Sequence, residues 1–335
     1  EFSFAHGMLP AFVGGEFPSL AALRATSYGR VRDAAFFREV KRIEVRGGTR
    51  ATSLDLARRT VAIEGVEAGP RETLAWDHLV LATGAATRFP AGVAPGDAVH
   101  AGHDPFALRD LRRRLERGAA DHVAVLGGGC VGVSLAAALA ETWGVAVTLL
   151  EAADRILPDA LDPELAAIAA RALRGLGVTV RTGATVTGAA STPSGATVTI
   201  GAETLACDAA VVALGVEARS EIARLAGLPV GAAGGLLTDD RLSCAPGVWA
   251  CGDVVETAHL LGPPRLPGRS ALAARMGRLV ADGIAGRPGR WAPVCGSFAV
   301  RLGAVTIAST GLTAAAARAA GLDADVAWSC APDRS

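Results

Sequence analysis

Apolar and polar residues alternate in blocks along the middle of the chain, and the blocks have the lengths of strands and helices. Three short apolar runs have the length of buried strands: 122–126, 145–150 and 178–181. Two segments between them have helical spacing of apolar residues: 132–141 and 162–174. This alternation predicts a βαβαβ unit with a parallel sheet. The segments 196–200 and 209–214 complete the unit, which we expect to end near Thr238.

The segments on either side of this unit do not form a domain by themselves. Before it, strand-like patterns cover three short stretches: 39–45, 60–63 and 79–82. After it come one more apolar strand at 248–253 and a helical pattern at 269–285. The simplest interpretation is one domain interrupted by another. From Ser297 onward, two strand-like runs and a short helix at 313–320 predict a fraction of a third domain.

The composition agrees with packed domains and limits the partners. Among the 335 residues, 50% are hydrophobic and 20% are charged, which excludes disorder. The 33 basic and 33 acidic residues cancel, so charge favours neither nucleic acid nor an anionic membrane. Lys41 is the only lysine, which leaves one candidate for Schiff-base catalysis. Three glycines interrupt the apolar run 123–140, so a strand, a turn and a helix explain it better than a membrane span.

The six cysteines are scattered, without a C-x-x-C pair or histidines at metal-ligand spacing. We therefore expect a reducing, cytoplasmic compartment and no metal site. Cys207, Cys244 and Cys251 are interpreted as buried strand residues. Five arginines lie in the helical segment 104–117, and we expect them to form a solvated face rather than a binding patch. They are Arg109, Arg112, Arg113, Arg114 and Arg117.

A glycine-rich turn separates the strand at 122–126 from the next helix. Its sequence is Gly127-Gly128-Gly129-Cys130-Val131-Gly132, a G-x-G-x-x-G pattern. The first glycine of this pattern permits a tight turn, the second admits a pyrophosphate, and the third allows close helix packing. Glu151, 19 residues after Gly132, closes the next strand, where a carboxylate binds a ribose 2′-hydroxyl and repels a 2′-phosphate. The pattern predicts a dinucleotide site rather than a merely structural turn, and favours NAD over NADP, a preference that nearby Arg155 weakens.

Two other strands end in small residues: Leu79-Val80-Leu81-Ala82-Thr83-Gly84-Ala85 and Gly247-Val248-Trp249-Ala250-Cys251-Gly252-Asp253. Together with the Gly127 turn and Ala213-Leu214-Gly215, they make the chain resemble the FAD-dependent pyridine nucleotide-disulfide oxidoreductase superfamily over essentially its whole length. The segment Ser3–Pro10, with Gly14-Gly15 after it, resembles the redox-cysteine segment of the CoA-disulfide reductase and NADH oxidase branch. Thr306–Leu312 resembles the opening of that branch's dimerisation domain.

This resemblance implies an α/β fold with two Rossmann-like dinucleotide-binding domains, the NAD domain being inserted into the FAD domain. An α+β dimerisation domain begins at the end of the chain, which implies a homodimer for the complete protein. The implied ranges are 1–105 for the first part of the FAD-binding domain, 106–238 for the NAD(P)-binding domain, 239–290 for the second part of the FAD-binding domain, and 291–335 for a partial dimerisation domain.

The resemblance also implies FAD and NAD(H) as cofactors. Asp253, after Gly252, would hold the ribityl chain of FAD, although a helix cap is the alternative role. Thr83, Gly84 and Ala85 would lie against the cofactor, and the backbone of Val40 would meet the adenine. Gly215 would lie at the nucleotide site. The helix carrying Arg275–Arg278 would direct its N-terminus at the pyrimidine edge of the flavin.

The sequence departs from the family pattern in three ways. A first strand with its own FAD glycine fingerprint, a unit of roughly 30 residues, does not precede Glu1. We expect the chain to be a piece of a longer protein, the alternative being that the site has lost its pyrophosphate cradle. Gly7 stands where the branch has its redox cysteine, and glycine cannot attack a disulfide. Cys130 takes the position of an aromatic gate over the nicotinamide pocket, with Ser134 where the branch usually has glutamate.

These observations lead to three hypotheses. The first is an enzyme, an NAD(P)H-dependent flavoprotein oxidoreductase, which passes a hydride from NADH to flavin N5 and then electrons to a quinone, an electron carrier, dioxygen or a small disulfide without a cysteine relay. His6 would line the acceptor pocket as a proton donor, with an ordinary loop histidine as the alternative. The second is a flavin-less NAD-binding sensor or assembly protein. The third is a CoA-disulfide reductase-like enzyme in which Cys130 replaces the missing thiol, the alternative being a small residue packed at a helix start.

Overall fold

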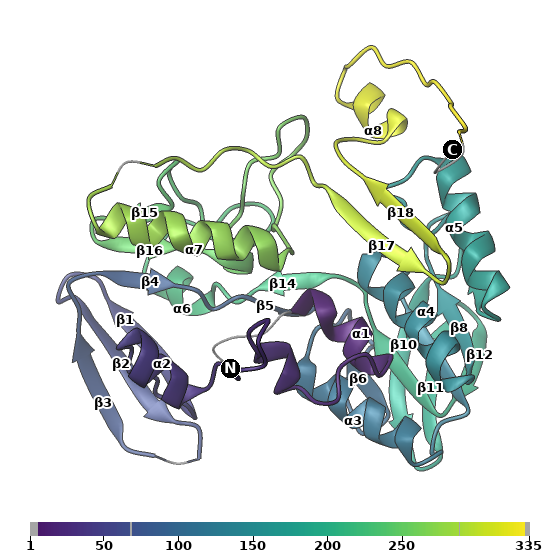
Figure 1. Ribbon diagram of the computed structural model, residues 1–335, viewed down its shortest axis with the longest axis horizontal. Helices are drawn as coiled ribbons and strands as arrows, with labels where there is room; N and C mark the ends of the chain where they lie inside the picture. The colour runs from purple at the N-terminus through teal and green to yellow at the C-terminus, as the bar shows by residue number, and fades with distance from the viewer. Residues whose placement is uncertain (1–5, 68, 288, 332–335) are drawn as a thin grey trace.

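A parallel sheet forms the centre of the larger half of the molecule (Figure 1). The structure is a computed structural model that describes residues 6–67, 69–287 and 289–331. Across the sheet the strands follow the order β6 (Val99–Ala101), β13 (Ala209–Val212), β7 (His122–Leu126), β8 (Ala146–Leu150) and β9 (Thr179–Arg181). All neighbouring strands are parallel. The order β9, β8, β7, β13 is the 3-2-1-4 order of a mononucleotide-binding half, so the predicted βαβαβ unit is confirmed.

Alternation along each strand gives this sheet two buried faces. Val123 and Val125 point into one core, with helices α4 (Cys130–Trp143) and α5 (Pro163–Gly175). Ala124 and Leu126 point into a second core. A three-stranded antiparallel sheet covers that side: β10 (Val186–Thr192), β11 (Gly195–Ile200) and β12 (Glu203–Cys207). Because both faces are covered, the strands are apolar throughout rather than alternating.

The second domain has a smaller sheet and its own core. The parallel pair β4 (Leu79–Leu81) and β16 (Val248–Ala250) is extended by β15 (Ser243–Ala245). Helix α7 (Ser270–Ile284) packs against it through Met276 and Val280, and residues of α6 (Glu221–Leu225) join the same core. An antiparallel sheet lies at the far end: β1 (Thr49–Asp55), β2 (Thr60–Gly65) and β3 (Arg71–Ala75).

The strand expected at 39–45 is wrong. Residues 34–41 form helix α2 (Ala34–Lys41), because the carboxylate of Asp33 accepts a hydrogen bond from Phe36 N–H and caps the first turn. Arg42 then adopts a left-handed conformation with φ 57° and ends the helix. The strand begins only at Thr49, after a turn. The alternation of apolar and polar residues at 39–45 therefore lies in the end of a helix and in a loop, and not in a strand.

Two of the chain's crossings between the domains, one before and one after the nucleotide-binding sheet, pair with each other. Strand β5 (Ala85–Thr87) follows β4, and strand β14 (Val216–Ala218) follows β13. They form an antiparallel ribbon in which Ala85 faces Ala218. The chain that follows β14 contributes Ala223 to the core of the smaller domain. The chain that follows β5 continues into β6, which joins the nucleotide-binding sheet. That sheet therefore extends outside the expected range 106–238.

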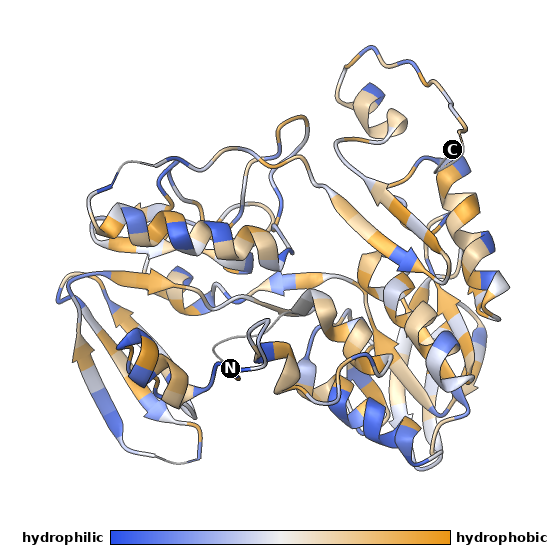
Figure 2. Ribbon diagram, viewed as in Figure 1, coloured by the Kyte–Doolittle hydropathy of each residue, from blue (hydrophilic) through white to orange (hydrophobic). Residues whose placement is uncertain are grey.

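Both ends of the described chain pack on the nucleotide-binding domain. Helix α1 (Leu9–Val13), which follows the turn η1 (His6–Met8), buries Leu9, Phe12 and Val13 in the same core as α4. The hairpin of β17 (Phe298–Leu302) and β18 (Val305–Ser309) buries its apolar side there too, and α8 (Ala314–Ala319) follows. Figure 2 shows apolar residues concentrated along the sheets and α4. Within the described residues, no helix is both long and apolar enough for a membrane span.

Candidate functional site

The glycine-rich turn leaves β7 at the point where the sheet order reverses, between β7 and β13. Gly127 has φ +107°, and a Cβ there would meet the carbonyl oxygen of Ala213. A Cβ on Gly132 would overlap the carbonyl oxygen of Gly127, so only glycine lets α4 approach the turn so closely. At Gly129, the N-cap of α4, no atom lies within 4 Å of the Cβ position. The backbone there faces open space at a helix N-terminus, which suits a pyrophosphate.

Glu151 follows β8 and reaches back to this turn. Its Oε2 accepts a hydrogen bond from Gly128 N–H at 2.6 Å, and its Oε1 accepts one from Ala153 N–H at 2.8 Å. The half-buried carboxylate is therefore fixed in orientation at the carboxyl end of the sheet. Val131 packs partly against the large core. These residues fit the NAD site that the sequence predicts, and the binding of ribose hydroxyls by Glu151 stays a prediction.

Arg88 fixes the loop that follows β13, the strand next to the glycine-rich turn. Its Nε and Nη2 both donate to the carbonyl oxygen of Leu214, at 3.1 and 2.8 Å, and its backbone N–H donates to Gly215. Gly215 has φ +98°. Arg88 thus ties the loop after β13 to strand β5 at the ribbon between the domains. No periodic pattern or motif in the sequence indicates this role of Arg88, because the contact joins segments 126 residues apart.

The two strand ends expected at the flavin lie next to each other. Parallel β4 and β16 pair in register, and Cys251 N–H donates to Leu81 at 3.0 Å. Gly84 and Gly252 both have positive φ, and no atom lies within 4 Å of the Cβ position of Gly84. Thr83 Oγ1 donates to the carbonyl of Arg219 at 2.7 Å, Ala85 is buried in β5, and half-buried Asp253 lies in the turn η3 (Gly252–Val254).

This edge fits part of an FAD site. Gly84 and the half-buried Asp253 each lie three residues after the paired strand residues Leu81 and Ala250, and the Cβ position of Gly84 is open. The second half of an FAD site requires its own glycine cradle. Among residues 6–67, 69–287 and 289–331, the structure has one strand, glycine turn and helix of that kind, at Gly127–Gly132.

The N-termini of helices α4 and α7 meet at a junction that contains Cys130, Arg269, Ser270 and Gly7. Cys130 is the first residue of α4, and Arg269 is the N-cap of α7. Arg269 Nη2 lies 3.9 Å from Cys130 Sγ, and Ser270 Oγ lies 3.8 Å from the Cβ position of Gly7. The position matched to the redox cysteine therefore lies beside the N-terminus of the flavin-side helix. Ser134 Oγ donates to the Cys130 carbonyl inside α4.

Two sequence predictions at this site have other outcomes. Residues 3–5 and the side chain of His6 lie outside the described residues, so the proton-donor role of His6 stays a prediction. Val40 lies in α2 with 48% of its surface exposed, and not in a strand as the sequence suggested. Its expected contact with the FAD adenine also stays a prediction, without support from a strand edge.

The other buried thiols are unsuited to redox chemistry. Burial raises the pKa of Cys207 to about 11 and that of Cys244 to about 12, and burial also raises the pKa of Cys251. A thiol that stays protonated is a poor nucleophile. All six cysteines are free. Cys130 is thus the one cysteine of the described chain that lies at the junction.

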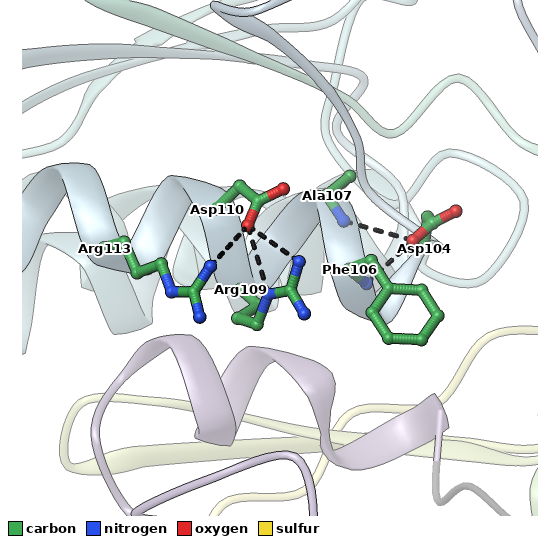
Figure 3. A network of polar contacts seen from close by, with 6 residues as sticks. All are labelled: Asp104, Phe106, Ala107, Arg109, Asp110 and Arg113. Atoms are coloured by element: carbon green, nitrogen blue, oxygen red, sulfur yellow. Dashed lines mark hydrogen bonds and ion pairs between the residues drawn. The ribbon is translucent and has the colours of Figure 1, made fainter.

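The arginines of helix α3 (Pro105–Glu116) are partly structural, which corrects the prediction of a solvated face. Asp104 caps the helix, and Arg109 and Arg113 pair with Asp110 on its exposed side (Figure 3). Arg112, in contrast, donates to the carbonyl oxygens of Phe12 and Phe17. Arg114 donates to the carbonyl oxygen of Asp208 at 3.0 Å. These two arginines anchor neighbouring segments of the chain.

Comparison with known proteins now identifies the class. The family model described as pyridine nucleotide-disulphide oxidoreductase matches residues 11–277, and the chain belongs to this family, whose members use FAD and NAD(P)H. The predicted superfamily and its two-domain α/β fold are confirmed. Within the family, the chain is 28% identical over 275 residues to an NADH oxidase from Methanocaldococcus jannaschii, covering 79% of this chain and 60% of that protein.

Two further relatives have different acceptors in their names. The ferredoxin--NAD(+) reductase component of an anthranilate 1,2-dioxygenase system from Burkholderia cepacia is 36% identical over 60% of this chain and 48% of its own. The solved structure of an NAD-dependent persulfide reductase from A. fulgidus has a TM-score of 0.90 at 32% identity, covering 96% of this chain and 59% of that chain. The chain thus spans about three fifths of the length of the curated relatives that it matches.

Proposed function

We propose that this protein is an NADH-dependent flavoprotein oxidoreductase that passes electrons to its acceptor without a cysteine relay at the flavin. The observation that carries the proposal is the position of Gly7. It lies beside Ser270 at the N-terminus of α7, where the two proposed nucleotide sites would meet, and it has no thiol. Family membership supports the use of both cofactors.

The chain's own residues define what each site would do. Gly127, Gly129 and the N-terminus of α4 would bind the pyrophosphate of NADH, and Glu151 would bind its ribose. Thr83, Gly84 and Asp253 would hold FAD, at the edge formed by β4 and β16. FAD, when bound, accepts a hydride equivalent from NADH and releases electrons singly or in pairs. The protein would therefore align the two cofactors and exclude water between them.

Several acceptors are compatible with this arrangement. A quinone, an electron-carrier protein, dioxygen or a small disulfide each accept electrons from flavin directly. The relatives named as ferredoxin reductase components favour an electron carrier, whereas the NADH oxidase favours dioxygen. The open position at Gly7 admits an acceptor closer to the flavin side than a cysteine would.

Anaerobic titration of the FAD-loaded protein with NADH tests the proposal. We expect the visible absorbance of the flavin to be bleached by one equivalent of NADH and restored by an acceptor. An FAD-loaded protein that NADH does not bleach would contradict the proposal. A protein that binds NADH but no FAD, and turns over no acceptor, would instead support a nucleotide-binding sensor.

A second candidate function follows from the contact between Cys130 and Arg269. A disulfide reductase would use the Cys130 thiolate to attack a disulfide RSSR, which forms a mixed disulfide with Cys130 and releases one RSH after protonation. Two electrons from NADH through the flavin, with a proton, would then release the second RSH and restore the thiolate. The relative named as a persulfide reductase makes sulfur acceptors plausible substrates.

Cys130→Ser separates the two candidates, with Cys295→Ser as the matched control at an exposed cysteine. A Cys130 relay requires that disulfide-dependent NADH oxidation falls at least a hundredfold in Cys130→Ser and not in the control. Unchanged disulfide turnover in Cys130→Ser would eliminate the relay. Flavin bleaching by NADH should persist in both variants, because hydride transfer to flavin involves no thiol.

A further inference from the structure

Arg269 is a half-buried cation near the glycine-rich turn, although it belongs to the other domain. It precedes α7, and its guanidinium crosses the domain boundary to lie 3.9 Å from Sγ of Cys130, the first residue of α4. Its Cζ also lies 5.7 Å from the centroid of the Phe298 ring. Among the described residues, no carboxylate lies within ion-pair distance of it. Its neighbours are thus a thiol and an aromatic ring.

This environment leaves the positive charge of Arg269 without a counterion. A guanidinium has five N–H donors, and a thiol sulfur is a weak acceptor. A partly desolvated cation with such partners gains most from an anion that brings two oxygens, since Arg binds phosphate through parallel hydrogen bonds. Several other arginines of the chain pair with a carboxylate: Arg181 Nη2, for example, lies 2.6 Å from Glu203 Oε2.

The anion expected nearest to Arg269 is the pyrophosphate of the dinucleotide. Cys130 follows Gly129 directly, and Gly129 is where the turn leaves open space at the N-terminus of α4. We infer that Arg269 binds the NADH pyrophosphate from the opposite side to the glycine turn, so that one phosphate pair is held by both domains. This inference rests on the proposed NADH site, and it adds a binding residue that the glycine motif does not contain.

The role has a consequence for the arrangement of the domains. The glycine turn belongs to the β7–α4 unit, whereas Arg269 caps the helix of the smaller core. A nucleotide bound between them would stabilise the packing of one domain on the other. An apolar or uncharged residue at position 269 would leave the nucleotide attached to one domain only.

Equilibrium binding to Arg269→Gln tests the inference without requiring turnover. The ligands are NADH, ADP-ribose, which keeps the pyrophosphate but has no nicotinamide, and adenosine, which has no phosphate. Arg275→Gln on the same helix is the control, because Arg275 is exposed and lies near the Trp291 ring. Arg269→Lys keeps the charge but not the paired geometry. Thermal unfolding of each variant checks that the fold is intact.

We expect Arg269→Gln to weaken NADH and ADP-ribose about tenfold to hundredfold, with adenosine unchanged. Arg269→Lys should recover part of the loss, and Arg275→Gln should bind like the wild type. Equal affinity of Arg269→Gln and wild type for ADP-ribose would overturn the inference, as would a loss confined to NADH. A wild-type protein that binds neither nucleotide would instead defeat the proposed function itself.

Discussion

Glu151 and Gly128 are joined by a hydrogen bond of 2.6 Å between a carboxylate oxygen and a backbone N–H. The bond closes the glycine turn against the end of β8, and the second oxygen of Glu151 is held by Ala153. The carboxylate is thus oriented before any nucleotide arrives, which lowers the entropic cost of binding. In the proposed NADH site, its negative charge would repel a 2′-phosphate.

Replacing Glu151 should therefore change the choice of nucleotide. In Glu151→Gln the charge is lost and a similar shape remains, so we expect the preference for NADH over NADPH to fall about tenfold, mainly through tighter binding of NADPH. Dissociation constants for both nucleotides measure the effect. Glu221→Gln, at an exposed carboxylate paired with Arg224, is the control. An unchanged ratio in Glu151→Gln would show that this carboxylate does not select the nucleotide.

Replacing two glycines of the turn by alanine should affect different properties: folding stability at Gly132 and NADH binding at Gly129. At Gly132 a Cβ would overlap the carbonyl of Gly127, so Gly132→Ala should lower the free energy of unfolding by about 1–3 kcal/mol or more. At Gly129 the Cβ position is open, and the backbone φ of −76° suits alanine. Gly129→Ala should therefore keep its stability but bind NADH more weakly. Denaturant unfolding and nucleotide titration of both variants check this, and equal behaviour of the pair would be inconsistent with it.

Restoring a thiol at position 7 should create the missing relay. Among the described residues, a Cβ at Gly7 has only Ser270 Oγ nearby, at 3.8 Å, so we expect Gly7→Cys to fold without strain. We expect one additional reactive thiol and a gain in disulfide-dependent NADH oxidation over the wild type. Gly7→Ser has similar size without the thiol and serves as the control. If Gly7→Cys and Gly7→Ser reduce disulfides equally, position 7 does not lie at the point of electron transfer.

His100 should make the fold sensitive to mild acid. It is buried in β6, and burial, with the nearby Arg114 charge, lowers its pKa to about 4, while an unfolded histidine has a pKa near 6.5. Below about pH 6.5 the unfolded chain takes up the proton first, so stability is full above that pH and falls as the pH drops towards 4. The loss is on the order of 3 kcal/mol.

The variant His100→Gln isolates this effect from titrating carboxylates. We expect urea unfolding of the wild type to lose stability between pH 6.5 and 4.5 more steeply than that of His100→Gln. The variant itself should fold, since glutamine is neutral throughout. Parallel pH profiles for the two proteins would mean that His100 is protonated in the folded state as readily as in the unfolded chain.

The elements that the sequence predicted well are those with a local cause. The runs 122–126 and 145–150 are buried on both faces, and Pro163 and the Gly127 turn mark helix starts through the backbone itself. Helix 34–41 was missed because its start depends on a single capping carboxylate, that of Asp33, and because Phe36 is its one buried residue. Because so little of this helix is buried, its apolar residues do not repeat with a clear helical period in the sequence.

The candidate site shows the same division. Gly127–Gly132 and Glu151 lie within one βαβ unit, so their relation follows from local spacing. Arg88 and Arg269 were not found, because each acts on a segment more than 120 residues away and belongs to no motif. The partial burial of Arg112 was also missed, since its partners Phe12 and Phe17 come from a distant helix and loop.

The paired crossings β5 and β14 restrict how the two halves of the molecule can move. A single connecting strand allows bending and twisting about its own axis, but two hydrogen-bonded strands form a strap that resists twist and shear. Bending across the width of the strap remains the easy motion. We therefore expect the two domains to move by rotation about one axis, across the width of the β5–β14 ribbon. Such a motion would return both proposed cofactor sites to the same alignment after each cycle.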